Sequence, residues 1–198
     1  MNPQDDWNDL SEPAAIVAPR LLGSLLVREI SDVQVSGRIV ETEAYNQSDA
    51  ASHSFKGRTP RTEIMFGSAG FLYVYFTYGM HYCCNVVTGE NGVGEAVLIR
   101  AVEPLGDEDK QAMGVNRKGR TGVDITNGPA KLCQALQIEK TLNGHDLRTS
   151  PLRLQLQPAL TEADIVRTTR IGISQAKDEP WRFYIRGNSY VSKTVSKL

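Results

Sequence analysis

The sequence predicts a single α+β domain, in which a mixed, largely antiparallel curved sheet carries flanking helices and a protruding β-hairpin. Runs typical of short strands outnumber the stretches with clear helix signals. The chain has 198 residues, 40% of them hydrophobic, which suits one domain with a real core. No period of about 20–50 residues repeats, so neither a solenoid nor a propeller is expected.

The clearest element is the stretch FLYVYFTYGMHYCCN, residues 71–85. Strand-forming residues run up to a Tyr-Gly-Met tripeptide and away from it again, which predicts a β-hairpin with a glycine turn. Because side chains alternate along a strand, Leu72, Val74 and Phe76 are expected to face the core. The amphipathic side chains of Tyr73, Tyr75 and Thr77 are expected on the opposite face. Protruding aromatic residues suit stacking on nucleobases. Taken alone, this stretch favours an ordinary hairpin whose tyrosines keep their hydroxyls in water.

The other elements follow from local signals along the chain. Residues 1–13 read as an acidic, mobile leader, and residues 14–198 as the domain. Helices are expected at residues 13–22, interrupted by Pro19, at 107–113, and from Asn127-Gly128-Pro129 onward, where proline suits the first turn. Strands are expected from Leu25 and, further along, in four stretches: 36–45, 96–103, 143–158 and 181–186. Polar loops are expected at 46–60 and 116–122.

Composition limits the functional classes. No apolar run approaches the roughly 20 residues of a membrane span, and the acidic start of the chain is unlike a secretory signal. Three cysteines, two of them adjacent, favour a reduced cytoplasmic protein. The absence of CxxC and HExxH motifs indicates no metal and no cofactor.

The net charge of −1 does not by itself indicate a polyanionic partner. Four acidic residues and no basic one fall within the first twelve, so the remaining chain is slightly basic. Basic residues gather at 56–61, 117–120 and 182–197. These clusters could contact phosphates or simply be solvated loops.

Two strands supply candidate catalytic groups. Glu43 stands in the stretch RIVETEAY and is either a solvated charge or a placed acid/base, and Glu41 on the same strand face could take that role instead. Arg100 interrupts the apolar strand AVLIRAV, which suggests an ion pair with an acid, either structural or functional.

Other candidates are weaker when taken one at a time. His53 lies between two serines and reads as a surface residue or a ligand. Asn85 could satisfy backbone groups or bind a base edge. Lys131 could hold a phosphate near the start of a helix. Cys83 and Cys84 read as small apolar fillers.

Six motifs occur in one order along the chain: RIVETEAY at 38–45, AASHS at 50–54, TPR at 59–61, LYVYFTYGMHYCCN at 72–85, LIRAVEP at 98–104 and NGPAKLCQAL at 127–136. With these motifs the sequence closely resembles the alkyladenine (methylpurine) DNA glycosylase family. The resemblance runs from about residue 19 to the end of the chain, with WRFYIRG and the region of Tyr190 and Val191 as its last element. One departure is His81, where family members often have an aromatic residue.

The resemblance implies a role for individual residues. It implies that Glu43 deprotonates the attacking water, and that Arg100 and the backbone carbonyl of Val191 help to hold that water. The implied pocket for a flipped base has four further members: Tyr45, His53, Tyr75 and Asn85, the last obstructing the amino group of guanine. Tyr78 is the implied intercalating residue. Further duplex contacts are implied for Thr59, Arg61, Met80, His81 and Lys131.

The implied activity is base-excision repair of alkylated or deaminated purines in double-stranded DNA, by a monomer without a cofactor. A base must leave the duplex before its glycosidic carbon can be attacked. Because no lysine stands beside Glu43 to form a Schiff base, base removal without strand cleavage is expected. Two rival classes stay open: a non-catalytic module that binds damaged nucleic acid, and an enzyme of free nucleosides.

Overall fold

The computed structural model describes residues 7–77 and 79–192. Its α+β class confirms the prediction: three α-helices surround one open antiparallel sheet. The helices are α1 (Ala14–Arg20), α2 (Asp107–Asn116) and α3 (Pro129–Ala135). The strands are β1 (Leu25–Ile30), β2 (Val33–Tyr45), β3 (Leu72–Thr77), β4 (His81–Val87), β5 (Ala96–Pro104), β6 (Leu152–Gln155), β7 (Ile165–Thr168) and β8 (Arg182–Ile185).

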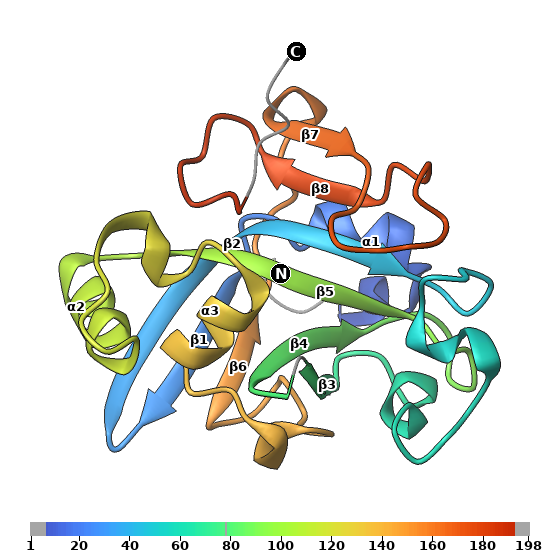
Figure 1. The fold of residues 1–198 in the computed structure, drawn as a ribbon, viewed down its shortest axis with the longest axis horizontal. Coiled ribbons are helices and arrows are strands. Elements are labelled where there is room, and N and C mark those ends of the chain that lie inside the picture. The colour runs from blue at the N-terminus through green and yellow to red at the C-terminus, as the bar shows by residue number, and fades with distance from the viewer. Residues whose placement is uncertain (1–6, 78, 193–198) are drawn as a thin grey trace.

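The 13-residue strand β2 is the centre of the sheet. The strand order is β3-β4-β5-β2-β1-β6, and β8 pairs with both β2 and β7 (Figure 1). Residues 41–43 of β2 therefore lie between β5 and β8. The buried side chains of residues 41–43 can therefore contact residues of β2, β5 and β8.

The two faces of β2 have different neighbours. The Thr42 hydroxyl donates to the Ala18 carbonyl of α1 over 2.9 Å, so Thr42 points toward α1. Neighbouring side chains in a strand point to opposite faces, which directs Glu43 away from α1. Helices α2 and α3 pack against β2, β4 and β5, and α3 follows a short 3-10 turn, Gly122–Ile125. The predicted helix start at Pro129 is confirmed.

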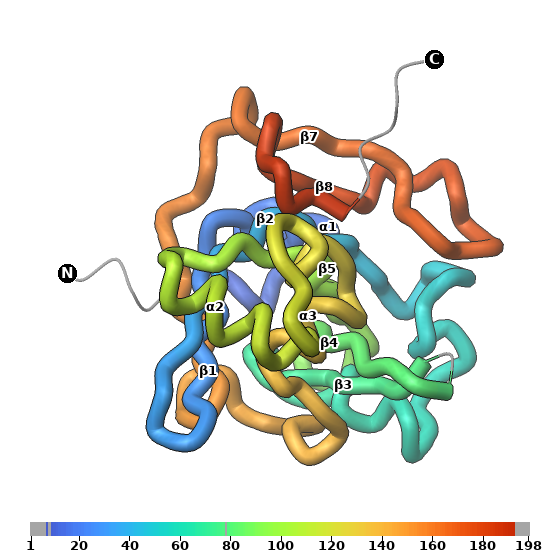
Figure 2. Tube along the Cα trace, turned by 60° about the vertical axis from the view of Figure 1, so that its left-hand side comes forward, coloured from blue at the N-terminus to red at the C-terminus, as the bar shows by residue number. Residues whose placement is uncertain are grey.

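The predicted hairpin is confirmed as β3 and β4, and Gly79 in its turn has φ +68°, a conformation that glycine adopts without strain. Figure 2 shows the hairpin running alongside the preceding segment, residues 46–66. The predicted faces were partly wrong. Leu72 and Val74 are buried as expected, but Phe76 is 51% exposed and Tyr73 is only 1% exposed. Phe76 lies beyond the edge of the main core, whereas Tyr73 joins a small second cluster with Met65.

Other segments also differ from expectation. Pro19 does not interrupt α1 but lies inside it, fully buried. The described part of the predicted leader contains a 3-10 turn, Trp7–Ser11, whose Leu10 is buried in the main core. The stretch 143–158 forms one strand, β6, rather than several. Strand β7 was not predicted, because four residues are too few to show a period.

Candidate active site

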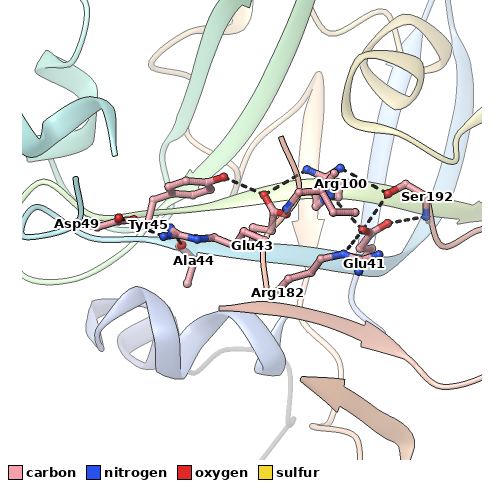
Figure 3. A network of polar contacts seen from close by, with 10 residues as sticks. Glu41, Glu43, Ala44, Tyr45, Asp49, Arg100, Arg182 and Ser192 are labelled. Atoms are coloured by element: carbon pink, nitrogen blue, oxygen red, sulfur yellow. Dashed lines mark hydrogen bonds and ion pairs between the residues drawn. The ribbon is translucent and has the colours of Figure 1, made fainter. Parts of the chain in front are cut away.

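Glu41 and Glu43 are fully buried, so the interpretation of Glu43 as a solvated charge is wrong. The guanidinium of Arg100 joins the two carboxylates: Nε donates to Glu41 Oε1 at 3.0 Å and Nη1 donates to Glu43 Oε2 at 3.1 Å (Figure 3). The predicted ion pair of Arg100 is confirmed, with two acids instead of one. The register of β2 with β5 is irregular here, moving from Ala101 opposite Glu41 to Ile99 opposite Thr42, so Arg100 lies at the irregularity.

Electrostatics fix the charge of this arginine. Burial alone would lower the pKa of Arg100, but the charges of Glu43 and Glu41 outweigh that effect and raise it. Arg182 of β8 is also fully buried and donates from Nε to Glu41 Oε1 at 2.7 Å. Two buried carboxylates thus face two buried guanidinium groups, which is the compensation that buried charges require.

Two further donors hold the Glu43 carboxylate. The Tyr45 hydroxyl donates to Oε2 at 2.8 Å, and the backbone N–H of Ile171 donates to Oε1 at 2.8 Å. Burial first, and then the neighbouring charge and hydrogen bond of Glu43, raise the pKa of Tyr45 well above its usual value. Tyr45 therefore stays protonated and acts as a donor. Three donors from three segments fix the direction of the Glu43 carboxylate.

Sequence reasoning missed a second buried ion pair, between Arg170 and Asp49, whose side chains are both fully buried. Arg170 also donates to the Ala44 carbonyl at 2.9 Å, and its guanidinium lies 4.6 Å from the centre of the Tyr45 ring. The ion pair connects the loop after β7, which contains Arg170, to the loop after β2, which contains Asp49. Since Ile171 follows directly, the pair also places the N–H group that contacts Glu43. No short motif marked it, because its partners are 121 residues apart.

A cavity of about 670 Å³ opens in front of this network. It brings together seven of the residues singled out from the sequence: Tyr45, His53, Arg61, Tyr75, Asn85, Arg100 and Lys131. Glu43 is not among the lining residues; it lies directly behind the part of the wall that Tyr45, Arg100 and Ile171 form. Val191 is buried, and its neighbour Ser192 lines the cavity.

Aromatic rings form one side of the cavity. His53 meets Tyr75 edge to face at 4.6 Å between centroids, and Tyr73 stacks on Tyr75 at 5.7 Å. Burial raises the pKa of Tyr75, which keeps its hydroxyl neutral. Such a wall suits a flat, polarisable ring, and tyrosine faces favour a cationic one.

His53 begins a 3-10 turn, His53–Lys56, that Ser52 caps by accepting from the Ser54 N–H. Arg61 Nη2 lies 3.4 Å from Nε2 of the ring. Because arginine can only donate, Nε2 is the acceptor, and Nδ1–H donates to the Tyr73 hydroxyl at 3.0 Å. Partial burial, and then the charge of Arg61, lower the pKa of His53 to about 4. The ring is therefore neutral at pH 7.

This pKa predicts a pH dependence of stability. The free energy of unfolding should fall as the pH drops from about 6.5 to about 4, because the unfolded chain binds a proton on His53 that the folded chain does not. The effect is smaller than full burial would give, since the ring is open to the cavity. Urea unfolding of the wild type and His53→Asn should show a difference that shrinks over this interval as pH falls. A constant difference would show that His53 has an ordinary pKa.

Asn85 and Cys83 complete the wall on β4. Asn85 is buried and donates from Nδ2 to the Tyr73 carbonyl at 3.1 Å, so it satisfies a backbone group while also lining the cavity. Burial raises the pKa of Cys83 to about 11, and this thiol also lines the cavity. Cys84 is the apolar filler that the sequence predicted, since it lies in the main core. The recognition role of Asn85 stays a prediction.

Of the residues predicted to contact the duplex, Arg61 and Lys131 line the cavity, whereas Thr59, Met80 and His81 do not. Lys131 lines the cavity but is held by Asp124 at 2.6 Å and by Asn127 at 2.8 Å. Thr59 exchanges hydrogen bonds with Thr62 in the loop before the hairpin. Met80, 70% exposed, and the exposed His81 stand at the hairpin turn. The predicted intercalating residue, Tyr78, falls outside the described residues.

Among residues 7–77 and 79–192, no cluster of three or more His, Cys, Asp or Glu side chains is arranged to hold a metal ion. Within the same residues, no helix is both long and apolar enough to cross a membrane.

Relatives that match nearly the whole chain are named as DNA glycosylases, which are hydrolases of base excision repair. A protein of Carboxydothermus hydrogenoformans named "Putative 3-methyladenine DNA glycosylase" is 52% identical over 90% of this chain and 93% of its own length. Proteins of the same name from Francisella tularensis and Methanoculleus marisnigri are each 49% identical over 89% of this chain and 92% of their own length. A family model described as methylpurine-DNA glycosylase matches residues 8–189. The chain belongs to the methylpurine-DNA glycosylase family, as its resemblance implied.

Proposed function

We propose that the protein takes an alkylated or deaminated purine out of duplex DNA and hydrolyses its N-glycosidic bond with a water molecule that Glu43 activates. One observation carries the proposal: the Glu43 carboxylate, oriented by Arg100, Tyr45 and Ile171, lies directly behind an aromatic cavity. A cavity of about 670 Å³ has room for a purine. Acting on a base in such a cavity requires that the base leave the stack, at a cost of a few kcal/mol.

For an alkylated purine, the chemistry needs little from the protein at the base itself. Alkylation at a ring nitrogen makes the purine cationic, so the base leaves with the electron pair of the glycosidic bond without strong acid assistance. The water oxygen forms the new bond to C1′, and its proton passes to Glu43. General-base catalysis of this kind contributes about 10²–10⁴-fold. The cationic, alkylated base is stabilised by the tyrosine faces, by roughly 0.5–2 kcal/mol each.

The proposal includes no strand cleavage. A glycosylase that cuts the strand uses an uncharged amine as nucleophile, and Lys131 is the cavity-lining lysine in the described part of the chain. Its ammonium is held between Asp124 and Asn127, and the hydrogen bond from Lys131 lowers the pKa of Asp124. Lys131 is thus already engaged by an ion pair and a hydrogen bond within the protein. We further propose that the protein acts as a monomer and that it works in the cytoplasm. The three free thiols of the described chain support the second point, because this compartment keeps thiols reduced.

Comparing a duplex substrate with a free nucleoside distinguishes the proposed glycosylase from a nucleoside hydrolase and from a non-catalytic recognition module. A duplex carrying one methylated purine and the matching free nucleoside should be incubated with the protein, and released base quantified by chromatography. Release from the duplex far exceeding release from the nucleoside is expected, because the exposed hairpin turn and the basic loops can contact only a polymer. Release from both alike would identify a nucleoside hydrolase, and binding to the duplex without release would identify a recognition module.

A further inference from the structure

Glu41, the second buried carboxylate of β2, contacts more of the site than Glu43 does. Arg100 Nε, Arg182 Nε and the Ser192 hydroxyl donate to its Oε1 at 3.0, 2.7 and 2.9 Å. The backbone N–H of Ser192 donates to Oε2 at 2.7 Å (Figure 3). A carboxylate offers about four lone-pair directions, and these four donors come from β5, β8 and the segment after β8.

This saturation argues against Glu41 as the base that activates water. Both glutamates are fully buried and neither lines the cavity, but Glu41 accepts from four donors, three of them at Oε1. Glu43 accepts three hydrogen bonds, and all three donor residues line the cavity wall, whereas Arg182, a donor to Glu41, does not. The sequence left open which of the two glutamates acts on water, and the geometry favours Glu43.

What Glu41 does hold in place are the groups around Glu43. A guanidinium group is a rigid planar fork, so fixing Arg100 Nε against Glu41 fixes the direction in which Nη1 points, toward Glu43. The Ser192 N–H belongs to the same peptide unit as the Val191 carbonyl. Since a trans peptide is planar with its N–H and C=O antiparallel, the hydrogen bond to Glu41 also sets the direction of that carbonyl.

We propose that Glu41 is a positioning residue that orients both Arg100 and the Val191 carbonyl toward the attacking water. This inference rests on the proposed function and on the role in holding the water that the family resemblance implies for those two groups. Glu41 does not touch the reacting atoms. Because it contacts β5, β8 and the segment after β8, Glu41 makes the position of the water-holding groups depend on how these strands pair with β2.

The test is single-turnover base release from a methylated duplex at saturating enzyme, where the rate constant reports the folded enzyme and the amplitude reports the fraction that is folded. Glu41→Gln should lower the rate constant by about 10²-fold, the loss typical of misplacing a reacting group by about 1 Å, while duplex binding is kept. The matched control is Glu95→Gln, the same change at a partly buried carboxylate that accepts from the Ala14 N–H at 2.6 Å and does not line the cavity. It should cost a little stability while its rate constant stays close to that of the wild type.

A second pair of variants tests the peptide contact without disturbing the buried charges. Ser192→Pro removes the N–H that donates to Glu41, whereas Ser192→Ala keeps it and loses only the hydroxyl contact. The proline variant should have the lower rate constant of the two. If Glu41→Gln keeps the wild-type rate constant, or if the two Ser192 variants react equally fast, Glu41 is a structural residue and the inference fails. If the wild type itself releases no base, the proposed function fails, and that outcome is seen before any variant is made.

Discussion

Glu43→Gln is expected to lower the single-turnover rate of base release by about 10²–10⁴-fold, the range for loss of a general base. Glutamine keeps the shape of the side chain, and its one carbonyl oxygen can still accept from either Tyr45 or Ile171, but it cannot take a proton from water. Binding to a duplex with a lesion should therefore be nearly unchanged. Filter binding or fluorescence anisotropy would measure the affinity, and chromatography of the freed base the rate.

Glu95→Gln is the matched control for this change. Glu95 is a partly buried carboxylate outside the cavity, which accepts from the Ala14 N–H at 2.6 Å. It should cost a little stability, because an uncharged amide is a weaker acceptor for the Ala14 N–H in the first turn of α1, but it should leave the rate constant intact. More than a few per cent of wild-type rate in Glu43→Gln would move the catalytic role to another group.

Arg100→Met is expected to have the largest effect on stability. The change leaves two fully buried carboxylates opposite Arg182 alone, and breaking a buried ion pair from one side costs about 3–5 kcal/mol. Base release should fall as well, because Arg100 directs Glu43. Urea unfolding at pH 7 would measure the loss of stability.

The control for Arg100→Met is Arg58→Met, which removes one partner of a surface ion pair with Glu63. Both side chains of that pair are about half exposed, at 51% and 55%, so its loss should cost about 1 kcal/mol or less. Equal loss of stability in the two variants would mean that Arg100 is not needed to balance Glu41 and Glu43.

Much of the site could be predicted from sequence, because several of its parts are short local motifs or residues whose type stands out from that of their neighbours. The hairpin was evident from alternating aromatic residues around Gly79, and α3 from a proline in its first turn. Arg100 was noticeable because a charge inside an apolar strand needs a partner. The aromatic wall followed once the motifs were taken together.

What could not be predicted depends on contacts between distant segments. Arg170 meets Asp49 across 121 residues, and Arg182 meets Glu41 across 141. Neither pair leaves a periodic trace in the sequence, although Arg182, like Arg100, is a charge in a strand. The exposure of Phe76 was also missed, because alternation assigns a face but does not show where the core ends.

The central claim is that this protein hydrolyses the glycosidic bond of a damaged purine in duplex DNA and leaves the strand whole. Product analysis of the wild type with an end-labelled, methylated duplex tests it most directly. We predict one free methylated purine for each abasic site, with full-length strands that break only after treatment with alkali. Absence of free base would contradict the claim of catalysis. Strands cut without alkali would contradict hydrolysis by water and point to a lysine nucleophile instead.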